Sequence, residues 1–105
     1  MTIGSPQAFA AIADPTRRAV LDLLLIEERT ASDLVTRFDM SQQAVSQHLQ
    51  TLRRAGLVDV RRKGRFQYYR LQAAPIRDVF DWSAKYRHFF DPFGHAWHVT
   101  KGRGR

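Results

Sequence analysis

The spacing of apolar residues changes from a helical period to a strand period at Gly56. Before this glycine, apolar side chains recur every three or four positions, as on helices that bury one face. After it, residues 57–62 and 66–71 are rich in β-branched and aromatic side chains on either side of the glycine-containing link 63–65, which is typical of a β-hairpin. The chain is therefore predicted to be mainly α with one small hairpin.

Short polar residues mark where the first helices begin. Asp14 followed by proline is typical of an N-cap and first helical position, and it predicts a helix over residues 15–27. A short helix at residues 9–13 is expected to precede it. Residues 30–33 resemble a capping box with Asp in place of Glu, which predicts a third helix that ends at residues 39–40. Three short helices are thus expected before Ser41.

The helix predicted after Ser41 has two contrasting sides. Ser41 is a suitable N-cap, Val45, Leu49 and Leu52 form a narrow apolar seam, and Gly56 is placed to end the helix. The other side is polar and consists of Gln42, Gln43, Ser46, Gln47, Gln50, Arg53 and Arg54. Only a few residues separate this helix from the preceding one, which is helix-turn-helix spacing.

A last helix is predicted from Pro75 to a stop at residues 91–94. Trp82, Phe89 and Phe93 widen its apolar stripe beyond what so small a monomer can bury, so we expect part of it to be a subunit interface. The predicted interface residues on this helix are Ile76, Val79, Phe80, Ser83, Tyr86 and Phe90. A ligand pocket lined by these aromatic side chains is the alternative.

Composition limits the class of protein. A chain of 105 residues with 44% hydrophobic residues suits one domain, expected at 1–92 with a C-terminal extension at 93–105 whose basic tail is disordered. The absence of cysteine excludes disulfides, thiolate metal sites and thiol redox chemistry. No apolar stretch is long enough for a membrane span, and no basic residue precedes Arg17 as in a signal peptide. A cytoplasmic protein without membrane partners is expected.

The net charge of +7 is concentrated in one segment. Residues 53–70 hold seven basic residues and one acidic residue, and no acid occurs from residue 40 to 58. Such clustering favours double-stranded DNA as partner over a merely solvated surface, because one α-helix fits the major groove and glutamine amides can pair with adenine. The predicted DNA-binding residues are Ser41, Gln42, Gln43, Ser46, Gln47, His48, Gln50, Arg53, Arg54, Arg61, Arg62, Lys63 and Arg65.

His48, Arg17 and Arg18 could bind other parts of the protein instead of DNA. His48 lies on the flank of the helix after Ser41, where it could contact a phosphate or bond to a neighbouring helix. Arg17 and Arg18 stand in the first turn of a helix, where the macrodipole disfavours cations. Pairing with an acid such as Asp14 is the simplest explanation for both arginines.

Four segments together resemble the ArsR/SmtB family of bacterial winged-helix repressors. They are DPTRR at 14–18, MSQQAVSQHL at 40–49, LRRAGLV at 52–58, and GR with YYRL within 64–71. The resemblance implies a winged helix-turn-helix of about five helices. It also implies a homodimer formed by the first and last helices, which adds Phe9 and Ile12 of the first helix to the predicted interface. It further implies repression at a palindromic operator, autoregulatory in some members, until an inducer, unidentified here, releases the DNA.

The metal sites of that family are missing from the sequence. One site uses a Cys-x-Cys pair on the helix at 31–38, where this chain has no cysteine. The other aligns with Ala73, Pro75, Tyr86 and Phe89, none of which can bind a metal. We therefore predict no metal or other cofactor.

Other functions stay open as alternatives. A metal-responsive repressor could use His88, His95 and His98, and a winged-helix module could instead bind protein or RNA. An enzyme is not expected, because the glycine-rich phosphate loop, HExxH and Gly-x-Ser-x-Gly motifs are absent.

Overall fold

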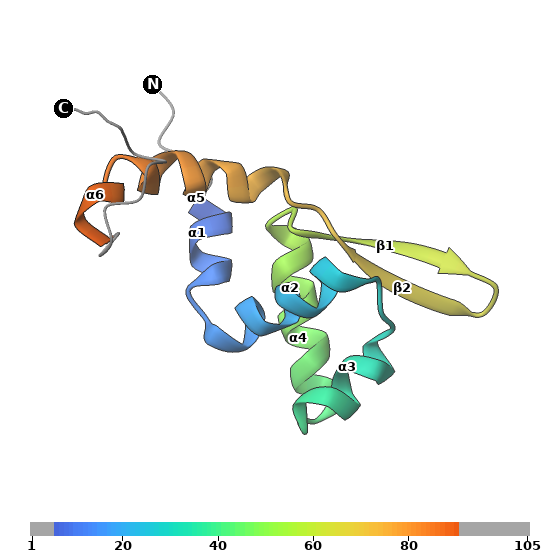
Figure 1. The fold of residues 1–105 in the computed structure, drawn as a ribbon. Coiled ribbons are helices and arrows are strands. Elements are labelled where there is room, and N and C mark those ends of the chain that lie inside the picture. Colours follow the sequence, from blue (N-terminus) through green and yellow to red (C-terminus); the bar gives the residue numbers. More distant parts are fainter. Residues whose placement is uncertain (1–5, 91–105) are drawn as a thin grey trace.

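The computed structural model describes residues 6–90, which form six helices and one two-stranded antiparallel hairpin (Figure 1). The elements are α1 (Pro6–Ile12), α2 (Pro15–Ile26), α3 (Ala31–Phe38), α4 (Gln42–Arg54), β1 (Val58–Lys63), β2 (Phe66–Leu71), α5 (Ala74–Ala84) and α6 (Arg87–Phe90). The predicted mainly helical winged helix-turn-helix is thus confirmed. No helix among the described residues is long and apolar enough to cross a membrane.

The predicted N-caps form, with one correction. Ser41 Oγ accepts a hydrogen bond from the Ala44 amide at 3.1 Å, and Thr30 Oγ1 accepts one from the Asp33 amide at 3.2 Å. The expected capping box, however, is only half formed. The Asp33 carboxylate binds the guanidinium of Arg29 at 2.9 Å, because an arginine offers a stronger, charge-assisted donor than the amide at the helix start.

Glycine ends α4 and turns the chain into the hairpin. Gly56 has a φ of +76°, its amide donates to Arg53 at 3.0 Å, and the Leu57 amide donates to Leu52 at 2.9 Å. These two bonds make a Schellman motif. The hairpin turn has two residues rather than the three predicted, since the last strand pair joins Lys63 to Phe66.

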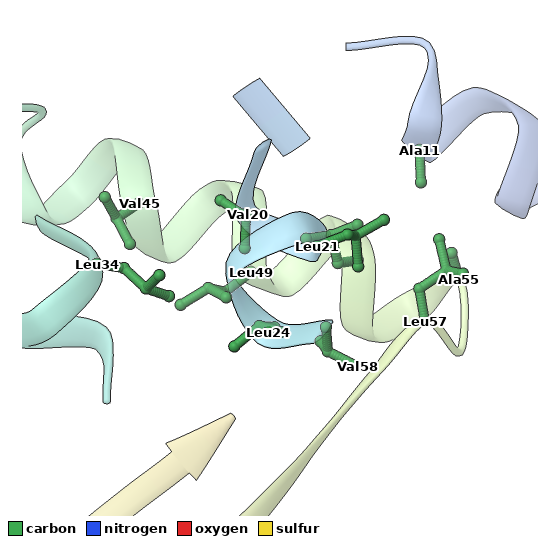
Figure 2. Packing of buried hydrophobic residues seen from close by; sticks show 11 residues of the cluster. Ala11, Val20, Leu21, Leu24, Leu34, Val45, Leu49, Ala55, Leu57 and Val58 are labelled. Carbon is green, nitrogen blue, oxygen red and sulfur yellow. The ribbon is translucent and has the colours of Figure 1, made fainter. Parts of the chain in front are cut away.

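One apolar cluster holds the helices to the base of the hairpin (Figure 2). Its buried members are Ala11, Val20, Leu21, Leu24, Leu34, Val45, Leu49, Leu52, Ala55, Leu57 and Val58. The predicted seam of α4 is confirmed, because Val45, Leu49 and Leu52 are all at most 2% exposed. With that side buried, the polar side of α4 points outward.

The hairpin is also fixed to the loop between α2 and α3. Arg29 and Tyr69 exchange two backbone hydrogen bonds, of 3.0 and 2.7 Å, and so form an isolated bridge beside β2. The Arg29 side chain is buried and donates to Asp33 and to the Leu23 carbonyl. This attachment sets the angle at which the hairpin, here called the wing, projects from the helices (Figure 1).

The prediction of one continuous last helix is wrong. α5 ends at Ala84, and α6 begins at Arg87 after a turn. In that turn the amide of Tyr86 donates to Ser83, and the amide of Phe89 donates to Tyr86, both at 2.9 Å. Hydrogen bonds over three residues wind the chain more tightly than an α-helix, so the direction of the helix changes there.

Candidate nucleic-acid interface

The polar side of α4 forms an exposed surface. Every predicted contact residue on it is exposed, namely Ser41, Gln42, Gln43, Ser46, Gln47, Gln50, Arg53 and Arg54. Amide and hydroxyl groups occupy the first three turns, and the two arginines occupy the last turn, where the helix dipole favours cations. The arrangement offers hydrogen-bonding groups that are flanked by positive charge.

His48 differs from these residues because it faces α2. Its side chain is 20% exposed, and its Nδ1 lies 3.3 Å from Arg17 Nη1 and 3.9 Å from Asp14 Oδ2. A guanidinium only donates, so Nδ1 is the acceptor in this contact. Of the two roles expected for His48, the structure shows the hydrogen bond to a neighbouring helix.

Arg17 links three helices. Its Nε donates to the Ala11 carbonyl at 2.6 Å, and its Nη2 donates to the Ala10 carbonyl at 3.3 Å. Sequence reasoning expected only the pairing with Asp14, which is present at 3.6 Å. Arg18 does not pair with Asp14, contrary to expectation; it donates to the Ile12 and Ala13 carbonyls, so both arginines bind carbonyl groups at the end of α1.

The Asp14 carboxylate is the anion of this cluster. Desolvation opposes its charged form, but the hydrogen bonds from the Thr16 and Arg17 amides, together with the adjacent Arg17 guanidinium, outweigh it. The pKa of Asp14 is therefore held below its ordinary value. An ionised Asp14 supports both Arg17 and the start of α2.

The basic wing residues are all exposed but are not equivalent. Arg61 Nη2 contacts both carboxylate oxygens of Glu28, at 3.1 and 3.0 Å, and Lys63 Nζ lies 3.9 Å from the same carboxylate. The side chains of Arg62 and Arg65 make no hydrogen bond or ion pair within residues 6–90. Two of the four predicted wing contacts are therefore already paired within the protein.

An open cleft separates the wing tip from the helix-turn-helix. It is lined by Thr30, Ala31, Ser32, Gln42, Arg62, Arg65, Phe66, Gln67 and Tyr69. The start of α4 and the unpaired wing arginines thus border the same opening.

Asp59 is the only acid of the wing strands. Its carboxylate accepts from the Val60 amide at 2.8 Å and from Arg70 Nη2 at 3.1 Å. These bonds, the first above all, hold the pKa of Asp59 below its ordinary value. The acid pairs at the base of the hairpin, where its register partner is Arg70, and leaves the tip basic.

The aromatic residues of α5 lie against α1 and solvent. Phe9 meets Trp82 edge-on at 5.6 Å between ring centroids, while Phe80 is 60% and Phe89 78% exposed. Two other predicted interface residues, Ile12 and Ile76, pack against the core of their own chain. Val79 and Ser83 are half-buried, and Tyr86 is exposed. The Phe90 side chain is not among those described. A large apolar surface is left uncovered.

Of the three histidines proposed for an alternative metal site, one, His88, lies within the described residues. No group of three His, Cys, Asp or Glu side chains within residues 6–90 could hold a metal ion. His88 is exposed, and its ring contacts that of Phe89 in a tilted arrangement, 4.1 Å between ring centroids. His95 and His98 lie outside the described residues.

Comparison with known proteins places this arrangement in a family. Residues 14–60 match the family model for bacterial regulatory proteins of the arsR family. The chain is 42% identical over 74 residues to the transcriptional repressor SdpR of Bacillus subtilis, covering 70% of this chain and 82% of SdpR. It is 35% identical over 71 residues to the transcriptional activator HlyU of Vibrio cholerae, covering 68% and 66%.

A solved structure has the same fold over most of both chains. It is the homodimeric winged helix-turn-helix DNA-binding domain of Mb0332 from Mycobacterium bovis, with a TM-score of 0.66 and 30% identity over 88% of this chain and 85% of that one. The protein therefore belongs to the arsR family of bacterial regulatory proteins, with the winged helix-turn-helix fold.

Proposed function

We propose that the protein is a homodimeric repressor that binds a palindromic DNA operator through α4 and the wing. The observation that carries this proposal is the exposed side of α4, which has no acid and continues into a basic wing tip. Gln42, Gln43, Ser46 and Gln47 would reach base edges, and Ser41, Gln50, Arg53, Arg54, Arg61, Arg62, Lys63 and Arg65 would reach the backbone. His48 would position the helix from its rear side.

Dimerisation is supported by the uncovered aromatic side chains of α5 and α6 and by the homodimeric Mb0332 domain. Two copies of α4 would then enter the major groove about 34–36 Å apart, one turn of DNA. Repression rather than activation is supported by the greater identity to SdpR than to HlyU.

Release of the operator by a metal at the usual family positions is not part of this proposal. Ala73, Pro75, Tyr86 and Phe89 have no side chain suited to the purpose. The inducer that would release the DNA is therefore not a metal ion bound at those positions.

Selection of duplexes from a random pool, followed by footprinting on genomic DNA, tests the function and identifies the operator. We expect a palindromic site whose binding weakens steeply with salt, by about 0.9 in the slope of log K for each phosphate contact. Gln43→Ala should reduce binding to the selected site more than to random DNA, whereas Arg54→Ala should reduce both equally. Equal losses in both variants, or binding that is independent of salt, would contradict the proposal.

A further inference from the structure

The basic side chains on one face of the wing are paired with a carboxylate, and those on the other face are not. The strand register pairs Arg61 with Tyr68 and Arg62 with Gln67. Because side chains alternate along a strand, Arg61 and Lys63 share one face and Arg62 lies on the other. The Lys63 ammonium accordingly lies over the Tyr68 ring, 5.3 Å from its centroid.

Glu28 occupies the face of Arg61 and Lys63. Its carboxylate binds Arg61 through both oxygens, at 3.1 and 3.0 Å, and lies 3.9 Å from Lys63. Glu28 directly precedes Arg29, whose backbone pairs with Tyr69 of the wing in both directions. The position of this anion is therefore fixed by the backbone, and the side chain is itself only 27% exposed.

The opposite face opens toward α4. Arg62 and Gln67 line the same cleft as Gln42, the first residue of α4, and so does Arg65 of the hairpin turn. Neither arginine is engaged by a carboxylate within residues 6–90. This is the face that a DNA backbone would meet once α4 lay in the major groove.

We propose that Glu28 determines which wing cations bind DNA, an inference that rests on the proposed function. A phosphate must compete with Glu28 for Arg61 and Lys63, whereas it can bind Arg62 and Arg65 without displacing a carboxylate. Non-specific DNA binding comes almost entirely from phosphate contacts. It is therefore weaker when Glu28 keeps Arg61 and Lys63 from the phosphates. The base contacts of α4 are unaffected, so the affinities for the operator and for other DNA fall together, and the number of wing cations that contribute to both is set by Glu28.

Glu28→Gln tests this role, because it removes the charge and keeps the shape. Glu27→Gln is the matched control: it changes the net charge equally, but Glu27 contacts Arg29 at 3.6 Å and not the wing cations. Affinity is measured against salt for a random-sequence duplex and for a duplex selected from a random pool. Circular dichroism verifies that each variant is folded.

We expect Glu28→Gln to bind the random duplex about two- to fivefold more tightly. Its slope of log K against log salt should steepen by about 0.9 for each cation released, and to the same extent for the random and the selected duplex. Glu27→Gln should keep the slope of the unchanged protein. In the unchanged background, Arg62→Ala should lose about 0.9 of slope, and Arg61→Ala should lose clearly less, because Glu28 competes with phosphate for Arg61.

Two results would overturn the role of Glu28. One is an equal slope for Glu28→Gln and Glu27→Gln, and the other is a loss for Arg61→Ala as large as that for Arg62→Ala. If the unchanged protein showed no salt-dependent DNA binding, the proposed function itself would fail, and that outcome is distinct from both.

Discussion

Arg17 Nη1 lies 3.3 Å from Nδ1 of His48, and this contact joins the first turn of α2 to the helix proposed to read DNA. The same guanidinium donates to the Ala10 and Ala11 carbonyls at the end of α1. One side chain thus connects a helix beside the aromatic surface with α4. The relative placement of the two surfaces depends on it.

Arg17→Ala should destabilise the fold by about 1.5–3 kcal/mol, because it leaves two carbonyls and the Asp14 carboxylate without their charged donor. Arg18→Ala is the control, since Arg18 also donates to two carbonyls of the α1 end but through exposed contacts, and it should cost less than about 1 kcal/mol. Urea denaturation measures both. Equal losses would contradict the special role of Arg17.

The Asp33 carboxylate should make stability depend on pH. The hydrogen bond from Arg29 is the largest cause that lowers the pKa of Asp33, with Arg37 adding to it against desolvation. Because the folded pKa lies below the ordinary 3.8, this stabilisation is fully present above that value and is lost as the pH falls through the folded pKa.

Asp33→Asn should therefore cost about 1 kcal/mol at neutral pH, a small value because the Asp33 side chain is 39% exposed. The difference from the unchanged protein should shrink as the pH is lowered below about 4. Asp22→Asn serves as control, since the Asp22 side chain is exposed and makes no hydrogen bond or ion pair in the described part of the chain. Denaturation at a series of pH values measures both, and a constant difference for Asp33→Asn would contradict this linkage.

The features that the sequence predicted correctly all have local signals. Ser41 at an N-cap, Gly56 behind the last turn and the spacing of Val45 and Leu49 are visible within a few residues of each other. Together they determine both the limits of α4 and the side that faces outward.

Features that depend on distant residues could not be predicted in the same way. The pairs Arg61–Glu28 and Arg17–His48 join residues 33 and 31 positions apart, and side chains of many residues could have made them. The turn between Ala84 and Arg87 was missed for another reason: the segment has no proline or glycine, and its apolar spacing stays helical.

Gly56 is expected to be the most sensitive position at the end of α4. Its φ of +76° is costly for residues with a β-carbon, whereas the space is adequate, since an added β-carbon would lie 3.5 Å from Pro75 Cγ. Gly56→Ala should therefore destabilise the protein by about 1–2 kcal/mol through the backbone alone. Gly56→Asn should cost less, because asparagine tolerates this conformation, and thermal denaturation should show that order. Equal costs would point to crowding instead.

The aromatic surface of α5 should control the oligomeric state. Phe80 is 60% exposed, and in a dimer built on α1 and α5 it would be buried against the second copy. Phe80→Glu should therefore yield monomers in analytical ultracentrifugation, because a carboxylate buried without a partner costs several kcal/mol. DNA affinity should fall with it, since a monomer contacts one half-site.

Leu25→Glu provides the matched control for this prediction. Leu25 is 71% exposed on α2, so the same change of an apolar side chain to a carboxylate is made outside the proposed interface. The Leu25→Glu protein should keep the mass of a dimer and the DNA affinity of the unchanged protein. Dissociation by both substitutions, or by neither, would show that the contact between copies does not run through α5.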